Sequence, residues 1–322
     1  MKLVVGIDTS CYTTSVALMD EEGLLLADAR KMLTVKAGNK GLAQSEMVFQ
    51  HTRNLPELFA NAWEQISGRP EICAIGASTQ PRSLPESYMP AFLVGTGYAR
   101  VLALTHGAPF LSLSHQEGHI LAGLWSAKGP DTEQFLAVHA SGGTTEITRV
   151  ENKDDRLSVE IIGGTKDIAA GQFVDRIGVA LALPFPAGPH LEQLAMDASE
   201  PAKIPLSVER TMVSFAGPET HAKRLLAKGE TPAGVAAGVQ VCISETIGRA
   251  VQAAMEITGF RDVLFVGGVM SNRYIRHAVT ERLCQDERVR LFFPRPEYSG
   301  DNAVGVAYFA LRAKHSDGRI RI

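Results

Sequence analysis

A pattern that occurs twice in the chain restricts its possible folds. Residues 3–19 and residues 135–150 each contain a short apolar run, a turn of small polar residues and a second apolar run. Short apolar runs with β-branched residues are typical of buried strands, so each segment predicts two neighbouring strands joined by a tight turn. Because the same unit recurs in both halves, we predict two related α/β lobes rather than one doubly wound sheet.

The composition is that of an average globular protein, and it excludes several classes. Hydrophobic residues make up 45% and charged residues 21% of the 322 residues, which disfavours disorder, collagen-like structure and a disulfide scaffold. The net charge of −3 provides no basic field that would hold nucleic acid through counterion release. An RNA partner would therefore bind locally or together with other subunits.

Cysteine positions and apolar runs predict the compartment. The four cysteines lie far apart and match no zinc-knuckle spacing, as expected in a reducing environment. Asp8 interrupts the apolar N-terminal run before it reaches the length of a signal peptide. No later run approaches the ~18 apolar residues of a membrane span. We therefore predict a cytoplasmic protein without membrane association.

The sequence HQEGH at residues 115–119 is the sharpest candidate for a metal site. On a helix, His115 and His119 share one face, so both imidazoles can hold the same cation. A zinc protease needs a glutamate directly after the first histidine; this position is Gln116, which excludes that activity. A third ligand is required, and Asp301 is one candidate among many acidic residues. Alternatively, the two histidines are ordinary surface or capping residues.

Two glycine pairs, Gly142-Gly143 and Gly267-Gly268, follow predicted strands. Glycine lets backbone N–H groups approach a phosphate or a ribose without a Cβ in the way. Neither pair belongs to a Walker or a GxGxxG motif, and either can simply form a turn. Their shared position at the carboxyl ends of strands predicts a nucleotide cleft between the lobes.

Asp167 and Asp175 flank a run of small residues near a predicted helix at residues 168–182. If both lie on that helix, their spacing places them on roughly the same side. The carboxylate of Asp175 could then accept hydrogen bonds from two ribose hydroxyls. The alternative is a solvated helix face on which Arg176 pairs locally.

Longer motifs cover nearly the whole chain. In order, they are GIDTSCYTTSVAL, HQEGH, ASGGTTE, DIAAGQFVDRIG, LPFPAGPHLEQLA, SFAG, GGVMSNRYIR and GDNAVGVAY. With this set, the chain resembles the catalytic subunits of tRNA threonylcarbamoyladenosine synthase, formerly described as glycoproteases. The resemblance implies an α/β fold of the actin-like ATPase type, with two duplicated ribonuclease-H-like lobes. It also implies a first lobe at residues 1–110, completed by a C-terminal helix at about residues 302–322, and a second lobe at residues 111–301 with helical insertions.

The resemblance further implies an acyltransferase reaction. That family transfers a threonylcarbamoyl group from threonylcarbamoyl-AMP to the exocyclic amine of the adenosine beside the anticodon of tRNA. The implied cofactors are one divalent metal (iron or zinc, with magnesium as the alternative) and ATP or threonylcarbamoyl-AMP. The implied metal ligands are His115, His119 and Asp301. The residues implied for the nucleotide are Ser141, Gly142, Gly143, Asp175, Gly188 and Asn272. No catalytic residue is identified.

The partners implied by the same family are tRNA, bound transiently, a smaller paralogous subunit on the first lobe and an accessory ATPase. A local cluster of positive charge consists of Arg30, Lys31, Lys36 and Lys40. It could contact tRNA phosphates, or it could be a solvated loop.

Several positions depart from the family pattern. Tyr12 and Thr13 replace an acidic pair, Gln172 replaces a glutamate, and Glu219 replaces the lysine of SFSGLKT. The metal ligands are retained, whereas much of the acidic surround of the first lobe is not. Besides an active acyltransferase, the sequence therefore allows a paralogue that binds ATP or the adenylate as a regulatory subunit, or a carbamoyltransferase that acts on a small molecule.

Overall fold

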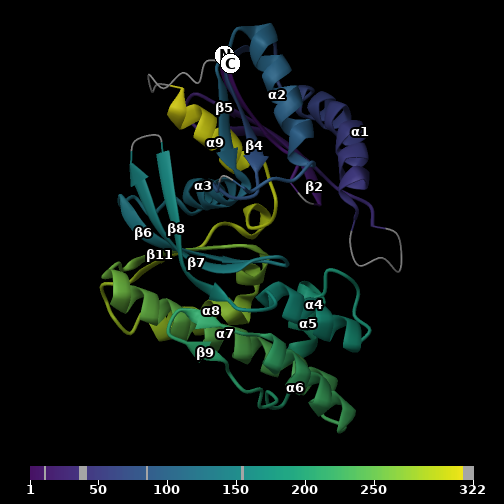
Figure 1. The fold of residues 1–322 in the computed structure, drawn as a ribbon, viewed down its shortest axis with the longest axis vertical. Helices are drawn as coiled ribbons and strands as arrows, with labels where there is room; N and C mark the ends of the chain where they lie inside the picture. The colour runs from purple at the N-terminus through teal and green to yellow at the C-terminus, as the bar shows by residue number, and fades with distance from the viewer. Residues whose placement is uncertain (11, 36–41, 85, 154–155, 315–322) are drawn as a thin grey trace. The chain divides into compact units, whose positions relative to one another are not determined.

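The computed structural model consists of two compact units (Figure 1). It describes residues 1–10, 12–35, 42–84, 86–153 and 156–314. Unit 1 comprises Met1–Ser126, Asn152–Leu157 and the chain from Asp301 onward, and unit 2 comprises Ala127–Glu151 and Ser158–Gly300. Among the described residues, no helix combines the length and the apolar character that a membrane span needs.

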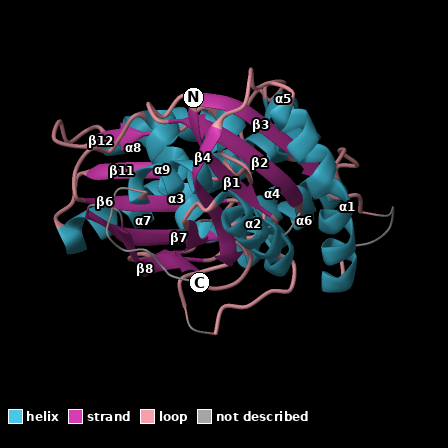
Figure 2. Ribbon diagram, turned by 90° about the horizontal axis from the view of Figure 1, so that it is seen from above, coloured by secondary structure: helices cyan, strands magenta, loops and turns pink. Residues whose placement is uncertain are grey.

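Unit 1 is built on a five-stranded sheet. Its strands are β1 (Lys2–Asp8), β2 (Thr13–Asp20), β3 (Leu25–Met32), β4 (Glu71–Gln80) and β5 (Phe110–Ser114). Its helices are α1 (Gln44–Trp63), α2 (Phe92–His106), α3 (His115–Ala127) and α9 (Val304–Ala313). The spatial order is β3-β2-β1-β4-β5, with β2 antiparallel to its two neighbours and β4 and β5 parallel to β1. Figure 2 labels strands β1 to β4 of this sheet. Because β5 pairs with β4, residues 111–126 group with unit 1, whereas the sequence analysis places them in the second lobe.

Unit 2 repeats this strand order. Its strands are β6 (Gln134–Ala140), β7 (Thr145–Lys153), β8 (Arg156–Thr165), β9 (Val208–Glu209), β10 (Met212–Val213), β11 (Asp262–Val266) and β12 (Arg290–Phe292). The order β8-β7-β6-β11-β12 matches β3-β2-β1-β4-β5, with β7 antiparallel to β6 and with β11 and β12 parallel to it. The short strands β10 and β9 extend the sheet beyond β8. The predicted duplication is therefore confirmed, although the sequence analysis predicts no strand for β8, β9 or β10.

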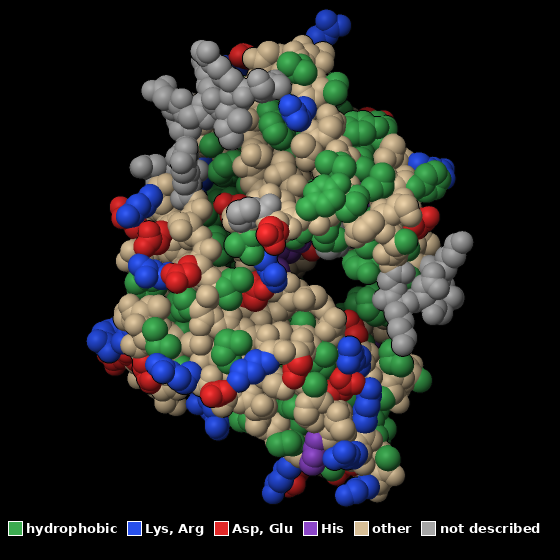
Figure 3. Space-filling model, in the orientation of Figure 1, with side chains coloured by type: hydrophobic (Ala, Val, Ile, Leu, Met, Phe, Trp, Pro, Cys, Tyr) green, Lys and Arg blue, Asp and Glu red, His purple; other side chains and the backbone are tan. Residues whose placement is uncertain are grey.

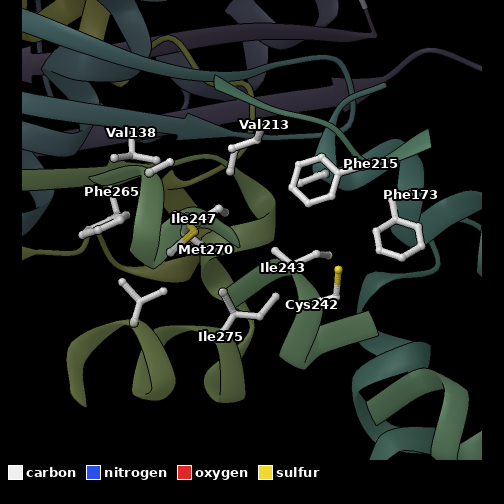
Figure 4. Close-up of a cluster of buried hydrophobic side chains, with 14 of the residues drawn as sticks. Val138, Phe173, Val213, Phe215, Cys242, Ile243, Ile247, Phe265, Met270 and Ile275 are labelled. Atoms are coloured by element: carbon white, nitrogen blue, oxygen red, sulfur yellow. The ribbon is translucent and has the colours of Figure 1, made fainter. Parts of the chain in front are cut away.

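The helices of unit 2 enclose its hydrophobic core. They are α4 (Ala170–Ala180), α5 (Gly188–Ala195), α6 (Ala216–Ala227), α7 (Pro232–Thr258) and α8 (Arg273–Leu283), with short 3-10 turns at Gly268–Ser271 and Pro296–Tyr298. The long helix α7 begins after Thr231, whose Oγ1 accepts the Gly234 N–H at 3.1 Å, and it ends at Gly259 in the left-handed conformation. Its buried face packs with side chains such as Phe265 of β11 (Figure 4). Each fully buried aliphatic or aromatic side chain contributes about 1.5–3 kcal/mol.

Two glycines let α9 lie directly on the sheet of unit 1. A Cβ at Gly6 in β1 would lie 2.5 Å from the backbone oxygen of Ala303 and from the backbone nitrogen of Ala307. A Cβ at Gly76 in β4 would lie 3.0 Å from Val306. Distances below 3.0 Å force neighbouring atoms to move, so larger residues would separate helix and sheet. This close packing brings the segment that precedes α9 into unit 1.

Positive and negative side chains are interspersed on the face of the molecule seen in Figure 3. Two members of the predicted basic cluster are paired: Arg30 with Asp28, and Lys31 with Glu57 at 2.7 Å. The other two, Lys36 and Lys40, lie outside the described residues. The exposed pair of Lys31 and Glu57 contributes little to stability.

Candidate functional site

The two histidines of the HQEGH sequence lie on the first turns of α3, directly after β5. The start of this helix is a capping box. The Ser114 N–H donates to Glu117 Oε2 at 2.7 Å, and the Glu117 N–H donates to Ser114 Oγ at 3.2 Å. Ser83, from the segment after β4, also donates its hydroxyl to Glu117 Oε2 at 2.6 Å. Glu117 therefore holds the first turn of α3 in place.

His115, His119 and Asp301 converge in unit 1. Their ligand atoms all lie within 4.8 Å of one another. The two Nε2 atoms are 3.0 Å apart, and Asp301 Oδ1 lies 3.6 Å from His115 Nε2 and 3.3 Å from His119 Nε2. One helical turn separates the histidines, whereas Asp301 arrives from the distant segment before α9. The structure thus brings together all three residues that the resemblance implies as metal ligands.

Asp8, which the sequence analysis does not assign to the site, lies behind His115. It is 1% exposed, and its Oδ2 is 3.0 Å from His115 Nδ1. Burial by itself would raise the pKa of Asp8, but the charge and hydrogen bond of His115 outweigh it and lower this pKa. One sequence signal could have pointed to Asp8: it is a charged residue at the end of an otherwise apolar strand. A charge buried at such a position needs an oppositely charged or hydrogen-bonding partner.

The electrostatics of this cluster favour a cation. Burial opposes the charge of Asp301, but hydrogen bonds from His115 and His119 hold the pKa of Asp301 well below its usual range. Burial likewise opposes the charged form of His115, yet the attraction of Asp8 and the contact with Asp301 raise the pKa of His115 well above its usual value. Two nitrogen donors and one carboxylate oxygen form a donor set that zinc or iron accepts. The residues present therefore fit the divalent metal that the family implies.

The residues implied for the nucleotide lie in unit 2. Ser141, Gly142 and Gly143 form the turn between β6 and β7, closed by a Ser141 N–H to Thr144 O hydrogen bond of 2.8 Å. A Cβ built on either glycine would meet no heavy atom within 4 Å. The Gly171 N–H at the start of α4 donates to Ser141 O at 3.1 Å. The turn is thus anchored on one side and has space around both glycines.

The Asp175 carboxylate lies next to the start of α5, where Gly188 is the first residue. The Ala187 N–H, directly before Gly188, donates to Asp175 Oδ1 at 3.0 Å. Burial raises the pKa of Asp175, and this hydrogen bond only partly offsets the effect. Asn272 precedes α8, and its Oδ1 caps that helix by accepting the Ile275 N–H at 2.9 Å. Its amide N–H groups remain the donors that could reach a ligand.

Asp167 does not share a helix face with Asp175, contrary to the expectation. The helix α4 begins only at Ala170, and Asp167 Oδ1 instead accepts the Phe215 N–H at 2.9 Å at the start of α6. These hydrogen bonds, together with one from the Ser214 hydroxyl, outweigh burial and lower the pKa of Asp167. Its role is to cap α6.

Arg176 does not pair locally either. Its Nη1 reaches Glu219 Oε2 on α6 at 3.1 Å. Glu219, which stands where the family has lysine, also pairs with Lys223. The reversed charge at residue 219 is therefore compensated within unit 2.

Residues 27–308 match the family described as TsaD: tRNA N6-adenosine threonylcarbamoyltransferase. Among relatives with that description, a protein of Thermus thermophilus is 32% identical over 98% of this chain and 94% of its own length. One of Methanopyrus kandleri is 29% identical over 95% of this chain and 86% of its own length.

Solved structures with similar folds share little sequence with the chain. Full-length HypF in its phosphate- and nucleotide-bound form has a TM-score of 0.61 at 14% identity, covering 97% of this chain and 46% of HypF. The activator of the 2-hydroxyisocaproyl-CoA dehydratase from Clostridium difficile has a TM-score of 0.55 at 13% identity, covering 97% of this chain and 95% of the activator. These similarities show the fold alone, the actin-like ATPase fold. The family match and the identities over nearly the full length establish that the chain belongs to the tRNA N6-adenosine threonylcarbamoyltransferase family.

Proposed function

We propose that this protein transfers a threonylcarbamoyl group from threonylcarbamoyl-AMP to the exocyclic amine of the adenosine beside the anticodon of tRNA. The observation that carries this proposal is the convergence of His115, His119 and Asp301 in a chain of this family. In the reaction, the amine nitrogen forms a bond to the carbamoyl carbon, and the bond from that carbon to the AMP oxygen breaks. AMP leaves as an anion, and the amine loses a proton to solvent.

We assign the metal to His115, His119 and Asp301, and we favour iron or zinc over magnesium because two of the three donors are imidazoles. When bound, this metal supplies a Lewis acid for the acyl carbonyl. The capping box at Ser114 and Glu117 keeps the two imidazoles one turn apart on a fixed helix start. Because AMP is a good leaving group, we expect the residues of the chain to contribute mainly by positioning the reactants.

We assign binding of the nucleotide part of the substrate to residues of unit 2. We propose that the backbone N–H groups of Gly142 and Gly143 bind its phosphate, because neither residue has a side chain in the way. Asp175 would accept hydrogen bonds from the ribose hydroxyls through the oxygen that Ala187 does not use. Gly188 would pack against the nucleoside, and the amide of Asn272 would donate to the adenylate.

We further propose that a smaller paralogous subunit binds at α1 and α2, that an accessory ATPase supports turnover, and that the complex acts in the cytoplasm. Hydrophobic side chains gather over these helices (Figure 3). On α1, Phe49 is 54% exposed, and on α2, Val101 is 62% and Leu104 64% exposed. A groove between the helices is lined by apolar residues that include Phe59 and Trp63. Exposed apolar patches of this kind are typical of protein interfaces.

The test is incorporation of labelled threonine into tRNA. The full chain is combined with a threonylcarbamoyl-AMP-forming enzyme, the partner subunits, ATP and bicarbonate. We expect product with the wild type and with His277→Ala, an exposed histidine on α8, and a large loss with His119→Ala. Absence of product under conditions in which a Thermus thermophilus relative works would reject tRNA transfer. Nucleotide binding without transfer would then favour the regulatory alternative, and product from a small-molecule acceptor would favour the carbamoyltransferase.

A further inference from the structure

Asp8 occupies a position from which it can act on His115 but not on a metal held by the three ligands. Its Oδ2 contacts Nδ1 of the His115 ring at 3.0 Å. The nitrogen that faces His119 and Asp301 is the other one, Nε2. The two nitrogens of an imidazole point in different directions, so Asp8 contacts the ring on the side away from His119 and Asp301.

The Asp8 carboxylate is itself held on two sides. Its Oδ1 accepts the Ser10 N–H at 2.7 Å and the Ser78 hydroxyl at 2.9 Å. Ser78 lies on β4, which pairs in parallel with β1, the strand that ends at Asp8. With Oδ1 satisfied by these donors, Oδ2 is left to the His115 ring. A carboxylate held by two neighbouring strands has little freedom to turn away from that ring.

This arrangement determines which nitrogen of His115 is available to a metal. A carboxylate can only accept a hydrogen bond, so the His115 Nδ1 must carry the proton that is shared with Asp8. An imidazole with its proton on Nδ1 presents the lone pair of Nε2. We propose that Asp8 is a positioning residue that fixes His115 as an Nε2 ligand, and that it raises the affinity of the site for a divalent transition metal. This inference rests on the metal site of the proposed function.

The first experiment measures metal affinity with Co²⁺ alone as the probe. The full chain is stripped with a chelator and titrated while the visible absorption of Co²⁺ is followed. We expect Asp8→Asn to weaken Co²⁺ binding by about 10- to 100-fold, which is typical of the loss of a carboxylate behind a ligating histidine. The matched control is Asp262→Asn, which removes another buried strand carboxylate, in unit 2. It should lower stability and leave the Co²⁺ affinity within about threefold of the wild type.

The second measurement needs only the wild-type ring of His115, so it stands even if Asp8→Asn does not fold. In ¹⁵N-histidine-labelled protein loaded with diamagnetic Zn²⁺, the His115 resonances, assigned by their loss in His115→Gln, should show a protonated Nδ1 and a metal-bound Nε2. A metal-bound Nδ1 would overturn the proposal for Asp8.

The outcomes separate this inference from the function on which it rests. If the wild type binds Co²⁺, His119→Ala does not, and Asp8→Asn matches the wild type, the positioning role is wrong while the metal site stands. If the wild type shows no Co²⁺ binding, the metal site of the proposed function fails, and the role of Asp8 fails with it.

Discussion

Replacing Gly305 by alanine should separate α9 from α3 and dismantle the metal site. A Cβ at Gly305 would lie 1.9 Å from the carbonyl oxygen of Gly118 and 2.6 Å from the backbone nitrogen of Ala122. Real Cβ contacts are not shorter than 3.0 Å. The two helices must therefore move apart by at least about 1.1 Å, the difference between 1.9 and 3.0 Å, because both contacts are backbone atoms that cannot rotate away.

The movement has two measurable consequences. Overpacking against a rigid backbone costs about 3 kcal/mol, the upper end of the usual range. At about 2–4 °C per kcal/mol, the melting temperature should fall by roughly 6–12 °C. Asp301 precedes α9 and the two histidines lie on α3, so their 3.3 Å and 3.6 Å separations should also change. Metal–ligand distances tolerate only about 0.2 Å, so Co²⁺ binding should be lost.

Gly118→Ala on the facing helix is the matched control. Its Cβ would meet only Val306, at an ordinary 3.8 Å, and alanine favours a helix by about 1 kcal/mol over glycine. Thermal unfolding of the chelator-treated protein and Co²⁺ titration are the assays. We expect Gly118→Ala to keep or raise the melting temperature and to bind Co²⁺ as the wild type does. If Gly305→Ala behaves like Gly118→Ala in both assays, the argument from helix approach is refuted.

Three further predictions concern other parts of the chain. Ser114→Ala removes the cap of α3, so urea unfolding should show a loss of about 1 kcal/mol; an unchanged midpoint would contradict that role. Burial alone would raise the pKa of Asp262, but hydrogen bonds from Arg290 and Thr132 lower it, so its stabilising contribution is present above about pH 4 and is lost as the pH falls through the lowered pKa. Between about pH 6 and pH 3, Asp262→Asn should therefore lose less unfolding free energy than the wild type, and equal losses would exclude this pair as a source of acid sensitivity. Gly171→Ala places a Cβ 2.5 Å from the oxygen of Ser141, so calorimetry should show weaker ATP binding, and wild-type affinity would argue against the turn at residues 141–143 as the phosphate site.

Local features of the chain were accessible to sequence reasoning because their physics is local. The spacing of His115 and His119 places both on one helix face, and the serine and glutamate of the same short segment define where that helix begins. The strand–turn–strand pattern at residues 3–19 recurs at residues 135–150, and both copies form paired strands in the structure. The apolar periodicity does not show whether Asp167 belongs to the helix that follows it. In the structure, α4 begins only at Ala170, and Asp167 accepts a hydrogen bond at the start of α6 instead.

The sequence by itself determined the duplicated strand–turn–strand unit, the facing histidines and the family. Only the tertiary structure decided which acidic side chains join them. Asp301 reaches His119 because Gly305 lets α9 lie against α3, and Asp8 reaches His115 because β1 and β4 end side by side. Neither carboxylate is near the histidines along the chain, so local spacing does not connect them to the site. Their selection depends on backbone packing between elements that are far apart in sequence, and this packing exists only once the sheet and its helices have assembled.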